Sequence, residues 1–392
     1  MISLAQAYEI VIAAARPLPA ERVPLVECRG RVLAEPVVAD MAMPPFDKSM
    51  VDGYACRRVD LPGPLELVEV IAAGMSPEKI VGRGQCSKIM TGAPIPEGAD
   101  CVFIVEHSRE VDGRVTWTGE HTADNIVPRA SDVREGETLL HPGHAVRPQD
   151  VAVLASMGYA EPLVARRPSV AVIPTGDELV EPGEKPGPSQ IRNSNAYQLC
   201  GQVESAGGLP HYLGVARDTG HALHEKISDA IRKHDVVLLS GGVSMGDYDL
   251  VPGVLRENGV EILFDKIAVQ PGKPTVFGVS PEAFCFGLPG NPVSTFAVFE
   301  LLVKPFLLKL QGHDYRPPVV RAALAETFTR KVASREAWVP VTLDAEGRAR
   351  RVEYHGSAHI AALSFADGLI AFPVGDSTLE EGRVVAVRLL RH

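Results

Sequence analysis

The sequence predicts a multidomain protein that combines α/β and all-β architecture. Its 392 residues exceed one ordinary hydrophobic core, so we expect two to four domains. Between residues 167 and 313, short apolar runs alternate with helical segments, an order typical of strands joined by crossover helices. On both sides of this stretch, short alternating apolar and polar runs are separated by Gly and Pro turns, which indicates β-rich units.

The first part of the chain predicts a helix and then an irregular unit. Residues 1–16 carry apolar side chains at helical spacing, and the acidic Glu9 among them argues against a signal peptide, so we expect a cytoplasmic protein. Residues 1–40 and 137–166 are both punctuated by Pro and Gly. We expect these two ranges to pack together as one discontinuous, elongated linking domain with a short helix at 148–157.

Residues 41–136 predict a small β-rich domain. Alternating runs indicate strands at 65–71, 86–90, 101–106 and 115–117. Turn signals such as Asp112-Gly113 separate these runs.

Residues 167–313 predict a central α/β sheet domain. We expect strands at 170–173, 209–215, 235–239 and 285–288, and helices at 196–206, 219–233 and from 292 to about 310. Pro292 stands at the first position of the last helix, where an N–H group would have no intrahelical partner. This strand–helix order predicts parallel strands.

Residues 314–392 predict a second all-β unit, a C-terminal barrel or sandwich. It begins at the Pro317-Pro318 pair. Its expected strands lie at 322–331, 337–343, 350–354, 369–374 and 384–389.

The composition argues against several classes of protein. A hydrophobic fraction of 45% and a charged fraction of 22% are typical of soluble globular proteins, and no apolar run is long enough to cross a bilayer. A formal net charge of −10 and the lack of any Lys/Arg run argue against nucleic-acid binding. The six cysteines form no CxxC pair, and the pairs His141/His144 and His221/His224 lack further ligands, so we expect no zinc site.

Two strand ends in the central domain carry residues suited to ligand binding. The carboxyl ends of parallel strands meet at one edge of an open sheet, where ligands bind. Residues 175–178 (Thr-Gly-Asp-Glu) follow one strand, and adjacent carboxylates of this kind can bind Mg²⁺. Residues 240–242 (Ser-Gly-Gly) follow another, where glycines let the backbone approach a ligand and its N–H groups can surround an anion.

Two further segments belong to the same predicted crevice. Lys273 stands between a glycine and a proline in a rigid turn, and Lys266 lies seven residues earlier. Residues 287–292 end a strand and open a helix, whose N-terminus attracts anions. Taken singly, each segment could also be an ordinary turn or an exposed lysine, and Asp249 could be a helix N-cap. Their combination favours one crevice, in which four charged side chains converge: Glu178, Asp218, Asp249 and Lys273.

Eight segments together resemble the molybdopterin molybdenumtransferase family, which includes the bacterial MoeA proteins and the E domain of gephyrin. They lie in family order at 46–54, 90–100, 124–132, 173–179, 217–218, 240–249, 266–278 and 287–294. The resemblance covers essentially the whole chain. It implies a three-layer central domain similar to the molybdopterin adenylyltransferases. It also implies a homodimer whose cleft lies between the sheet domain of one subunit and the β domain of the other.

The resemblance also implies the chemistry. Family members use Mg²⁺ and insert molybdate into adenylylated molybdopterin, which releases AMP and forms Mo-molybdopterin. The implied catalytic residues are Glu178, Asp52, Thr91 and Lys273, and the implied Mg²⁺ ligands are Glu178, Asp218 and Asp249. The implied substrate-binding residues are Asp132, Asp177, Asp218, Gly241, Gly242, Ser244, Asp249, Lys266, Pro289, Gly290, Asn291 and Pro292.

The chain departs from the family pattern, and other functions stay open. Gln270 stands where members often have Lys, and Ala361-Ala362 where members often have a Ser pair. One alternative is adenylylation of molybdopterin itself, and another is a non-catalytic molybdopterin-binding scaffold. The expected partners are adenylylated molybdopterin, molybdate, a second copy of the chain and the adenylyltransferase of the same pathway, with no nucleic acid and no membrane.

Overall fold

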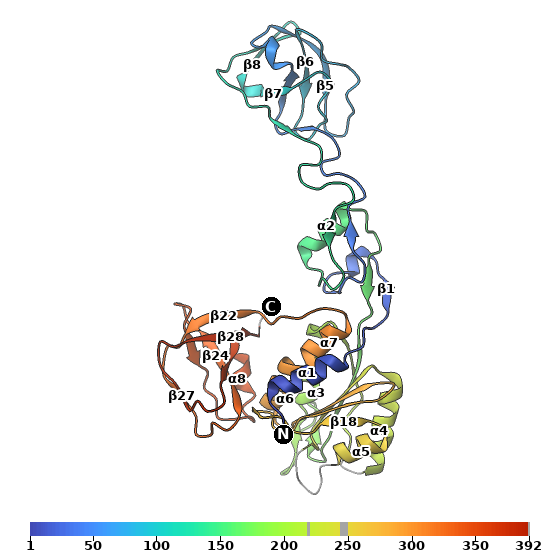
Figure 1. Cartoon of the computed structure of the whole chain (residues 1–392), viewed down its shortest axis with the longest axis vertical. Coiled ribbons are helices and arrows are strands. Elements are labelled where there is room, and N and C mark those ends of the chain that lie inside the picture. The colour runs from blue at the N-terminus through green and yellow to red at the C-terminus, as the bar shows by residue number, and fades with distance from the viewer. Residues whose placement is uncertain (218–219, 244–249, 391–392) are drawn as a thin grey trace.

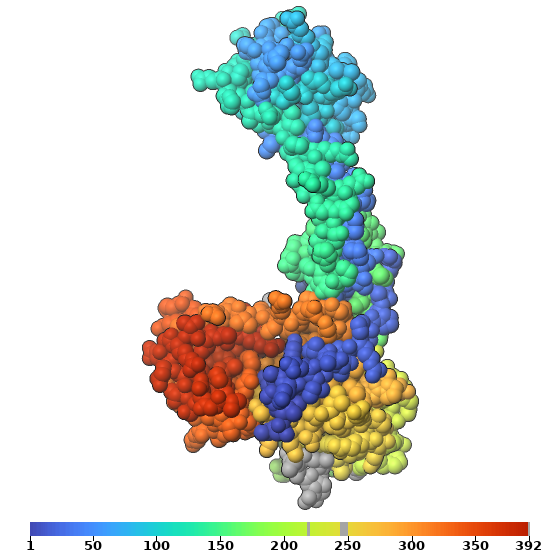
Figure 2. All heavy atoms as spheres, viewed as in Figure 1, coloured from blue at the N-terminus to red at the C-terminus, as the bar shows by residue number. Residues whose placement is uncertain are grey.

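A computed structural model describes residues 1–217, 220–243 and 250–390. It shows an elongated molecule with a small β-rich unit at one end, a narrow middle unit, and two larger units side by side at the other end (Figure 1). The space-filling view shows a thin neck between the β-rich unit and the rest of the molecule (Figure 2). We call these parts the far β unit, the middle unit, the α/β unit and the C-terminal unit.

The α/β unit is built on a six-stranded sheet. Its strands are β13 (Ser169–Pro174), β16 (Leu209–Tyr212), β17 (Val236–Ser240), β18 (Glu261–Phe264), β20 (Val276–Val279) and β21 (Phe284–Leu288). The strand order is β16-β13-β17-β21-β20-β18. The first four strands run parallel, as predicted. Strand β20 runs antiparallel to both of its neighbours, β21 and β18, which the expected layout of parallel strands did not include: only residues 280–283 join β20 to β21, too few for a crossover.

Helices cover both faces of this sheet. They are α1 (Leu4–Ala14), α3 (Asn195–Ser205), α4 (Gly220–Lys233), α5 (Val251–Glu257), α6 (Pro292–Val298), the π-helix η4 (Phe299–Val303) and α7 (Lys304–Leu310). One core contains residues of α1, α3, α6, η4 and α7, and a second core contains residues of α4 and α5. The side chains of Ala7 and Val11 are fully buried in the first core. Helix α1 therefore lies with the α/β unit, whereas the sequence grouped residues 1–40 with the middle unit.

The middle unit is formed by two separate parts of the chain. Its elements are β1 (Ala20–Arg22), η1 (Leu25–Glu27), β2 (Val37–Val38), β11 (Thr138–Leu140), α2 (Pro148–Ser156) and β12 (Leu163–Ala165). Strand β1 pairs with β12 and β2 pairs with β11, so each strand of the first part finds its partner in the second. The chain thus leaves this unit and returns to it after forming the far β unit.

The far β unit contains a second six-stranded sheet. Its strands are β4 (Gly53–Cys56), β5 (Leu65–Ile71), β6 (Gln85–Ile89), β7 (Cys101–Ile104), β8 (Ser108–Val111) and β9 (Arg114–Trp117), in the order β7-β4-β6-β5-β9-β8. The short 3-10 helices are η2 (Arg58–Asp60) and η3 (Val105–His107). Next to the neck, β3 (Lys48–Ser49) pairs with β10 (Ile126–Val127). The rings of Tyr54 and Phe103 stack in the core with their centroids 5.4 Å apart.

The C-terminal unit contains a third sheet. Its strands are β22 (Val319–Ala323), β24 (Glu336–Leu343), β25 (Ala349–Arg351), β26 (Gly368–Phe372) and β28 (Val384–Leu389). Strand β23 (Phe328–Thr329) pairs with β27 (Thr378–Leu379), and α8 spans Ala361–Ser364. One further strand, β19 (Val269–Gln270), comes from the chain between β18 and β20 and pairs with β24. This sheet therefore joins the C-terminal unit to the α/β unit. Among the described residues, no helix has the length and apolar character needed to span a membrane.

Candidate active site

A cavity of about 600 Å³ lies at the carboxyl ends of β13, β17 and β21, and we call it the strand-end cavity. Its walls include three loops that the sequence predicted to converge. The described lining residues include Thr175, Gly176, Glu178, Arg192, Asn193, Asn195, Ser240, Gly241, Gly242, Pro289, Gly290, Asn291 and Pro292. The structure thus brings Glu178 together with the two glycines of the second loop and with residues 289–292.

The loops around this cavity meet backbone to backbone. The N–H of Thr175 donates to the carbonyl of Ser240 at 2.8 Å, and the N–H of Gly241 donates to the carbonyl of Leu288 at 3.1 Å. Gly241 has a φ of +101°, and a Cβ atom there would lie 2.5 Å from the carbonyl oxygen of Thr175. Only glycine fits this close approach. The glycine pair that drew attention to this loop in the sequence is therefore required for steric reasons.

Asn195, the first residue of α3, ties two of the loops together. Its Nδ2 donates to Ser240 Oγ at 2.8 Å and to the Gly290 carbonyl at 2.7 Å. The ends of β17 and β21 are therefore held against the start of α3. Sequence analysis missed this role, because an asparagine before a helix is ordinarily explained by capping.

Glu178 occupies an exposed position on the wall of the strand-end cavity. Its carboxylate folds back over Gly176, where a Cβ atom would lie 2.4 Å from Glu178 Oε2. The described residues offer it no hydrogen bond or ion pair, so its oxygens are available to a ligand. Asp177 is exposed and does not line the cavity.

The predicted Mg²⁺ ligands are described only in part. Asp218, Ser244 and Asp249 lie outside the described residues. Within the described ranges, no group of three or more His, Cys, Asp or Glu side chains is arranged to hold a metal ion. Glu178 nonetheless supplies the carboxylate oxygens that Mg²⁺ prefers, so the described part of the site fits that ion.

A tyrosine pair anchors the segment that follows Glu178. The carboxylate of Glu181 accepts a hydrogen bond from Tyr197 at 2.7 Å and another from Tyr212. These bonds lower the pKa of Glu181, with Tyr212 as the larger cause. Asn193 donates to the Tyr212 hydroxyl at 3.0 Å and also lines the cavity. The chain on both sides of the cavity wall is therefore fixed to β16 and α3.

A second cavity of about 420 Å³ adjoins the first, and we call it the basic cavity. The two cavities share Pro274, Pro289 and Asn291 as lining residues. Four cationic side chains line the basic cavity, and the described lining residues include no acid: Lys273, Arg330, Arg335 and Arg351. Lys273 comes from the α/β unit and the arginines from the C-terminal unit, so the cavity lies between these two units.

The arginines of the basic cavity are positioned by neutral groups. Arg330 donates to the carbonyls of Arg335 and Pro373 at 2.6 Å and of Asp376 at 2.7 Å, and burial lowers its pKa. The guanidinium of Arg351 lies 4.9 Å from the ring centroid of Phe328. The Asp376 carboxylate also acts on Arg330, but the groups that bond or contact the two guanidinium groups are neutral, so net positive charge faces the cavity and favours binding of an anion. These arginines could not be predicted as site residues, because they belong to separate segments of the chain and no motif connects them.

The wall between the cavities includes a contact between units. Asn291 Nδ2 donates to Ser357 Oγ at 2.9 Å, and the N–H of Val293 donates to the Ser357 carbonyl at 3.0 Å. Gln270 lines the basic cavity at the position where family members often carry Lys. Ala361 and Ala362 line neither cavity.

Lys266 lies apart from both cavities. It stands between β18 and β19, and its carbonyl accepts from the N–H of Ile2 at 3.3 Å. The N–H of Ile267 donates to the carbonyl of Lys273 at 3.0 Å, so the two lysines lie on neighbouring segments, but only Lys273 lines a cavity.

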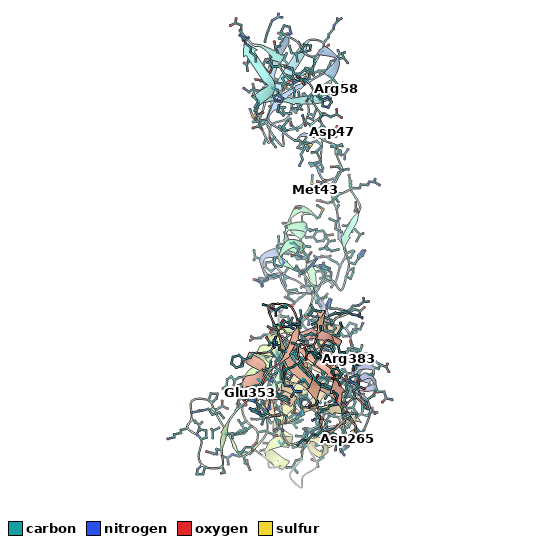
Figure 3. The ribbon with its side chains drawn as sticks, turned by 90° about the vertical axis from the view of Figure 1, so that its left-hand side faces the viewer. Met43, Asp47, Arg58, Asp265, Glu353 and Arg383 are labelled. Atoms are coloured by element: carbon teal, nitrogen blue, oxygen red, sulfur yellow. The ribbon has the colours of Figure 1, made fainter. Side chains whose placement is uncertain are left out.

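Three other predicted site residues lie elsewhere in the chain. Asp52 Oδ1 accepts from Thr91 N at 2.6 Å and from Thr91 Oγ1 at 2.8 Å, and these bonds, the backbone one first, lower the pKa of Asp52. Both residues belong to the far β unit. Asp132 lies near the neck, where its N–H donates to the carbonyl of Met43 at 3.0 Å. Figure 3 shows Met43 on the narrow connection below the far β unit, far from Glu353 of the C-terminal unit. Within one chain, Asp52, Thr91 and Asp132 are not brought to the cavities.

Comparisons with known proteins identify the class. Family models match the chain in order: "MoeA N-terminal region (domain I and II)" over residues 2–158, "Probable molybdopterin binding domain" over 171–309, and "MoeA C-terminal region (domain IV)" over 321–390. The sheet, its strand-end cavity and these matches define a protein with a molybdopterin-binding type of domain.

Individual relatives make the assignment more specific. The molybdopterin molybdenumtransferase of Bacillus subtilis (strain 168) is 35% identical over 389 residues, covering 95% of this chain and 90% of the relative. That of Staphylococcus aureus (strain N315) is 32% identical over 399 residues, covering 99% and 95%. The crystal structure of the molybdopterin biosynthesis MoeA protein from Pyrococcus horikoshii OT3 has a TM-score of 0.85 at 30% identity and covers 99% of this chain and 100% of that one. The chain belongs to the MoeA family.

Proposed function

We propose that this protein inserts molybdate into adenylylated molybdopterin, forming Mo-molybdopterin and releasing AMP. The observation that carries the proposal is the pair of adjoining cavities. One is lined by close-packed strand-end loops and the Glu178 carboxylate, and the other by four cations without a described acid. A reaction between an oxyanion and a larger organic nucleotide needs two such compartments side by side.

The basic cavity is the proposed molybdate site. Molybdate is an anion whose oxygens accept hydrogen bonds, and Lys273 and the arginines supply donors and positive charge. The strand-end cavity is the proposed site of the pterin nucleotide. The shared wall at Pro289 and Asn291 then places the dithiolene sulfurs beside the oxyanion, which makes the exchange of ligands effectively intramolecular.

Glu178, Asp218 and Asp249 are the proposed Mg²⁺ ligands. When bound, the ion would neutralise the charge of the pyrophosphate and make AMP a better leaving group. Glu178 and the two glycines of the loop, Gly241 and Gly242, all line the strand-end cavity in which the pyrophosphate would lie. Asn195 holds the ends of β17 and β21 in place while the substrate is bound.

A second copy of the chain is the proposed source of Asp52 and Thr91. These residues lie at the opposite end of the elongated molecule from the cavities, so one chain cannot bring them to its own substrate (Figure 1). A cytoplasmic homodimer in which the far β unit of one subunit reaches the cavities of the other would complete the site.

The test of the proposal is transfer by a Glu178→Gln variant. The amide keeps the shape of the carboxylate and removes its charge, and a bound Mg²⁺ contributes several kcal/mol, so we expect the transfer rate to fall by at least about tenfold. Far-ultraviolet circular dichroism should stay unchanged, since no described residue depends on this carboxylate. A wild-type rate in the variant would remove Glu178 from the mechanism.

The same assay separates insertion from adenylylation. Wild-type protein incubated with ATP and molybdopterin, but without molybdate, should form no adenylylated product. Accumulation of that product would show that the protein is an adenylyltransferase. Binding of the pterin nucleotide without any insertion of metal would favour the scaffold alternative.

A further inference from the structure

Two buried polar atoms at the strand-end cavity have no hydrogen-bond partner among the described residues. They are Thr175 Oγ1 and Asn195 Oδ1, and both residues line the cavity. Thr175 is only 4% exposed. Buried polar atoms in folded proteins are nearly always paired, because an unpaired one destabilises the fold. Two unpaired atoms on one ligand cavity therefore indicate where a bound molecule supplies the partner.

The orientation of each group is fixed by its surroundings. Asn195 donates through Nδ2 to the Gly290 carbonyl, which can only accept, so the amide cannot turn without bringing two oxygens together. The Thr175 hydroxyl packs against the two loop glycines, since a Cβ atom on Gly241 or Gly242 would lie 2.9 or 3.0 Å from Oγ1. Both oxygens are thus held in place before any ligand arrives.

The chemistry of these atoms limits what can bind them. Asn195 Oδ1 accepts hydrogen bonds and cannot donate, so its partner must carry an N–H or O–H group. Phosphate and molybdate oxygens at neutral pH are acceptors and are excluded as its partner. In adenylylated molybdopterin, the remaining donors are the N–H groups of the pterin ring and the amino and hydroxyl groups of adenosine.

The position of Asn195 favours the pterin over the adenosine. The dithiolene of the pterin receives the metal, so the pterin must lie next to the basic cavity. Asn195 is bonded to Gly290, which stands between Pro289 and Asn291, and these two residues line both cavities. We propose that Thr175 and Asn195 determine specificity by recognising the N–H-bearing edge of the pterin ring. This inference rests on the proposed function.

The decisive variant is Thr175→Val, which replaces the hydroxyl by a methyl group of similar size. The hydroxyl has no described partner in the free protein, so the thermal unfolding temperature of the variant should equal or exceed that of the wild type. The affinity for molybdopterin, measured anaerobically by calorimetry, should fall by about tenfold, since a buried hydrogen bond to the ligand is lost. The matched control is Thr175→Ser, which keeps the hydroxyl and should bind molybdopterin within about twofold of the wild type.

A titration with AMP distinguishes the two halves of the substrate. AMP should bind the wild type and the Thr175→Val variant equally. An equal loss of AMP affinity would place the adenosine at this site and overturn the assignment to the pterin. Unchanged molybdopterin affinity in Thr175→Val would also overturn it, as would a lower unfolding temperature, which would show that the hydroxyl bonds within the protein. Wild-type protein that binds neither ligand would instead overturn the proposed function itself.

Discussion

The arginines of the basic cavity are hydrogen-bonded to, or stacked on, neutral groups. Arg330 rests on three backbone carbonyls, and Arg351 lies over an aromatic ring. Lys273 is exposed, and the described residues offer it no ion pair. The positive charge of these side chains is therefore available to an anionic ligand, because it is not used in ion pairs that stabilise the fold.

Lys273 and Lys266 form a matched pair for testing this cavity. We expect Lys273→Ala to weaken molybdate binding by about tenfold or more, because a charged hydrogen bond to the anion is lost. Lys266→Ala removes the same charge from a residue that lines neither cavity, and it should bind within about twofold of the wild type. Calorimetric titration with molybdate measures both. Equal losses in the two variants would show that only the overall charge matters.

Residue types alone revealed only part of the site. Glu178 and the glycine loop were predicted, because each follows an apolar strand and strand ends meet at one sheet edge. Lys273 was predicted to share their crevice, but it lines the adjoining basic cavity. The arginines were not predicted, because their convergence depends on how the C-terminal unit sits against the α/β unit. Thr175 and Asn195 were not singled out, because an unpaired buried atom is visible only once all neighbouring partners are placed.

At the scale of elements, the strand-end loops depend on glycine at one contact. A Cβ atom on Gly241 would lie 2.5 Å from the carbonyl oxygen of Thr175, and its φ of +101° disfavours any side chain. We expect Gly241→Ala to lower the free energy of unfolding by about 2 kcal/mol or more. Urea unfolding followed by circular dichroism measures this change.

Gly253 provides the control for that substitution. It lies within α5, and a Cβ atom there would meet nothing within 4 Å. Gly253→Ala should therefore be neutral or raise the free energy of unfolding by about 0.5–1 kcal/mol. Similar losses in both alanine variants would contradict the steric explanation for Gly241.

The elements themselves were predicted better than their partners. The helices at 195–205 and 148–156 and the parallel strands β13, β17 and β21 follow from periodicity and capping. The reversed direction of β20, and the transfer of β19 to another sheet, did not follow. Apolar alternation shows that one face of a strand is buried but not which strand lies beside it. Helix α1 illustrates the same limit, since its apolar stripe did not indicate the core against which it packs.

At the scale of the whole molecule, the proposed dimer predicts which mixed subunits are active. If the far β unit of one subunit completes the cavities of the other, a heterodimer of Asp52→Ala with Glu178→Gln retains one intact site. Its activity should be about half that of the wild type, although each variant alone should keep at most about a tenth of the wild-type rate. Two affinity tags allow this heterodimer to be purified and assayed.

The reciprocal heterodimer provides the control. A chain carrying both Asp52→Ala and Glu178→Gln, paired with a wild-type chain, has one defect in each shared site and should be inactive. If each subunit instead used its own Asp52, this second heterodimer would be half active and the first would be inactive. The two results together decide whether the site is shared.

The pairing of β19 with β24 has a mechanical consequence. The N–H of Glu336 donates to the Ala268 carbonyl at 3.1 Å, so separating the α/β and C-terminal units would break main-chain bonds. The far β unit is attached only through the thin neck seen in Figure 2. We therefore expect the strand-end cavity and the basic cavity to keep their shape, while bending is concentrated at the neck. The far β unit would then approach or leave the cavities as a rigid body that turns about the neck.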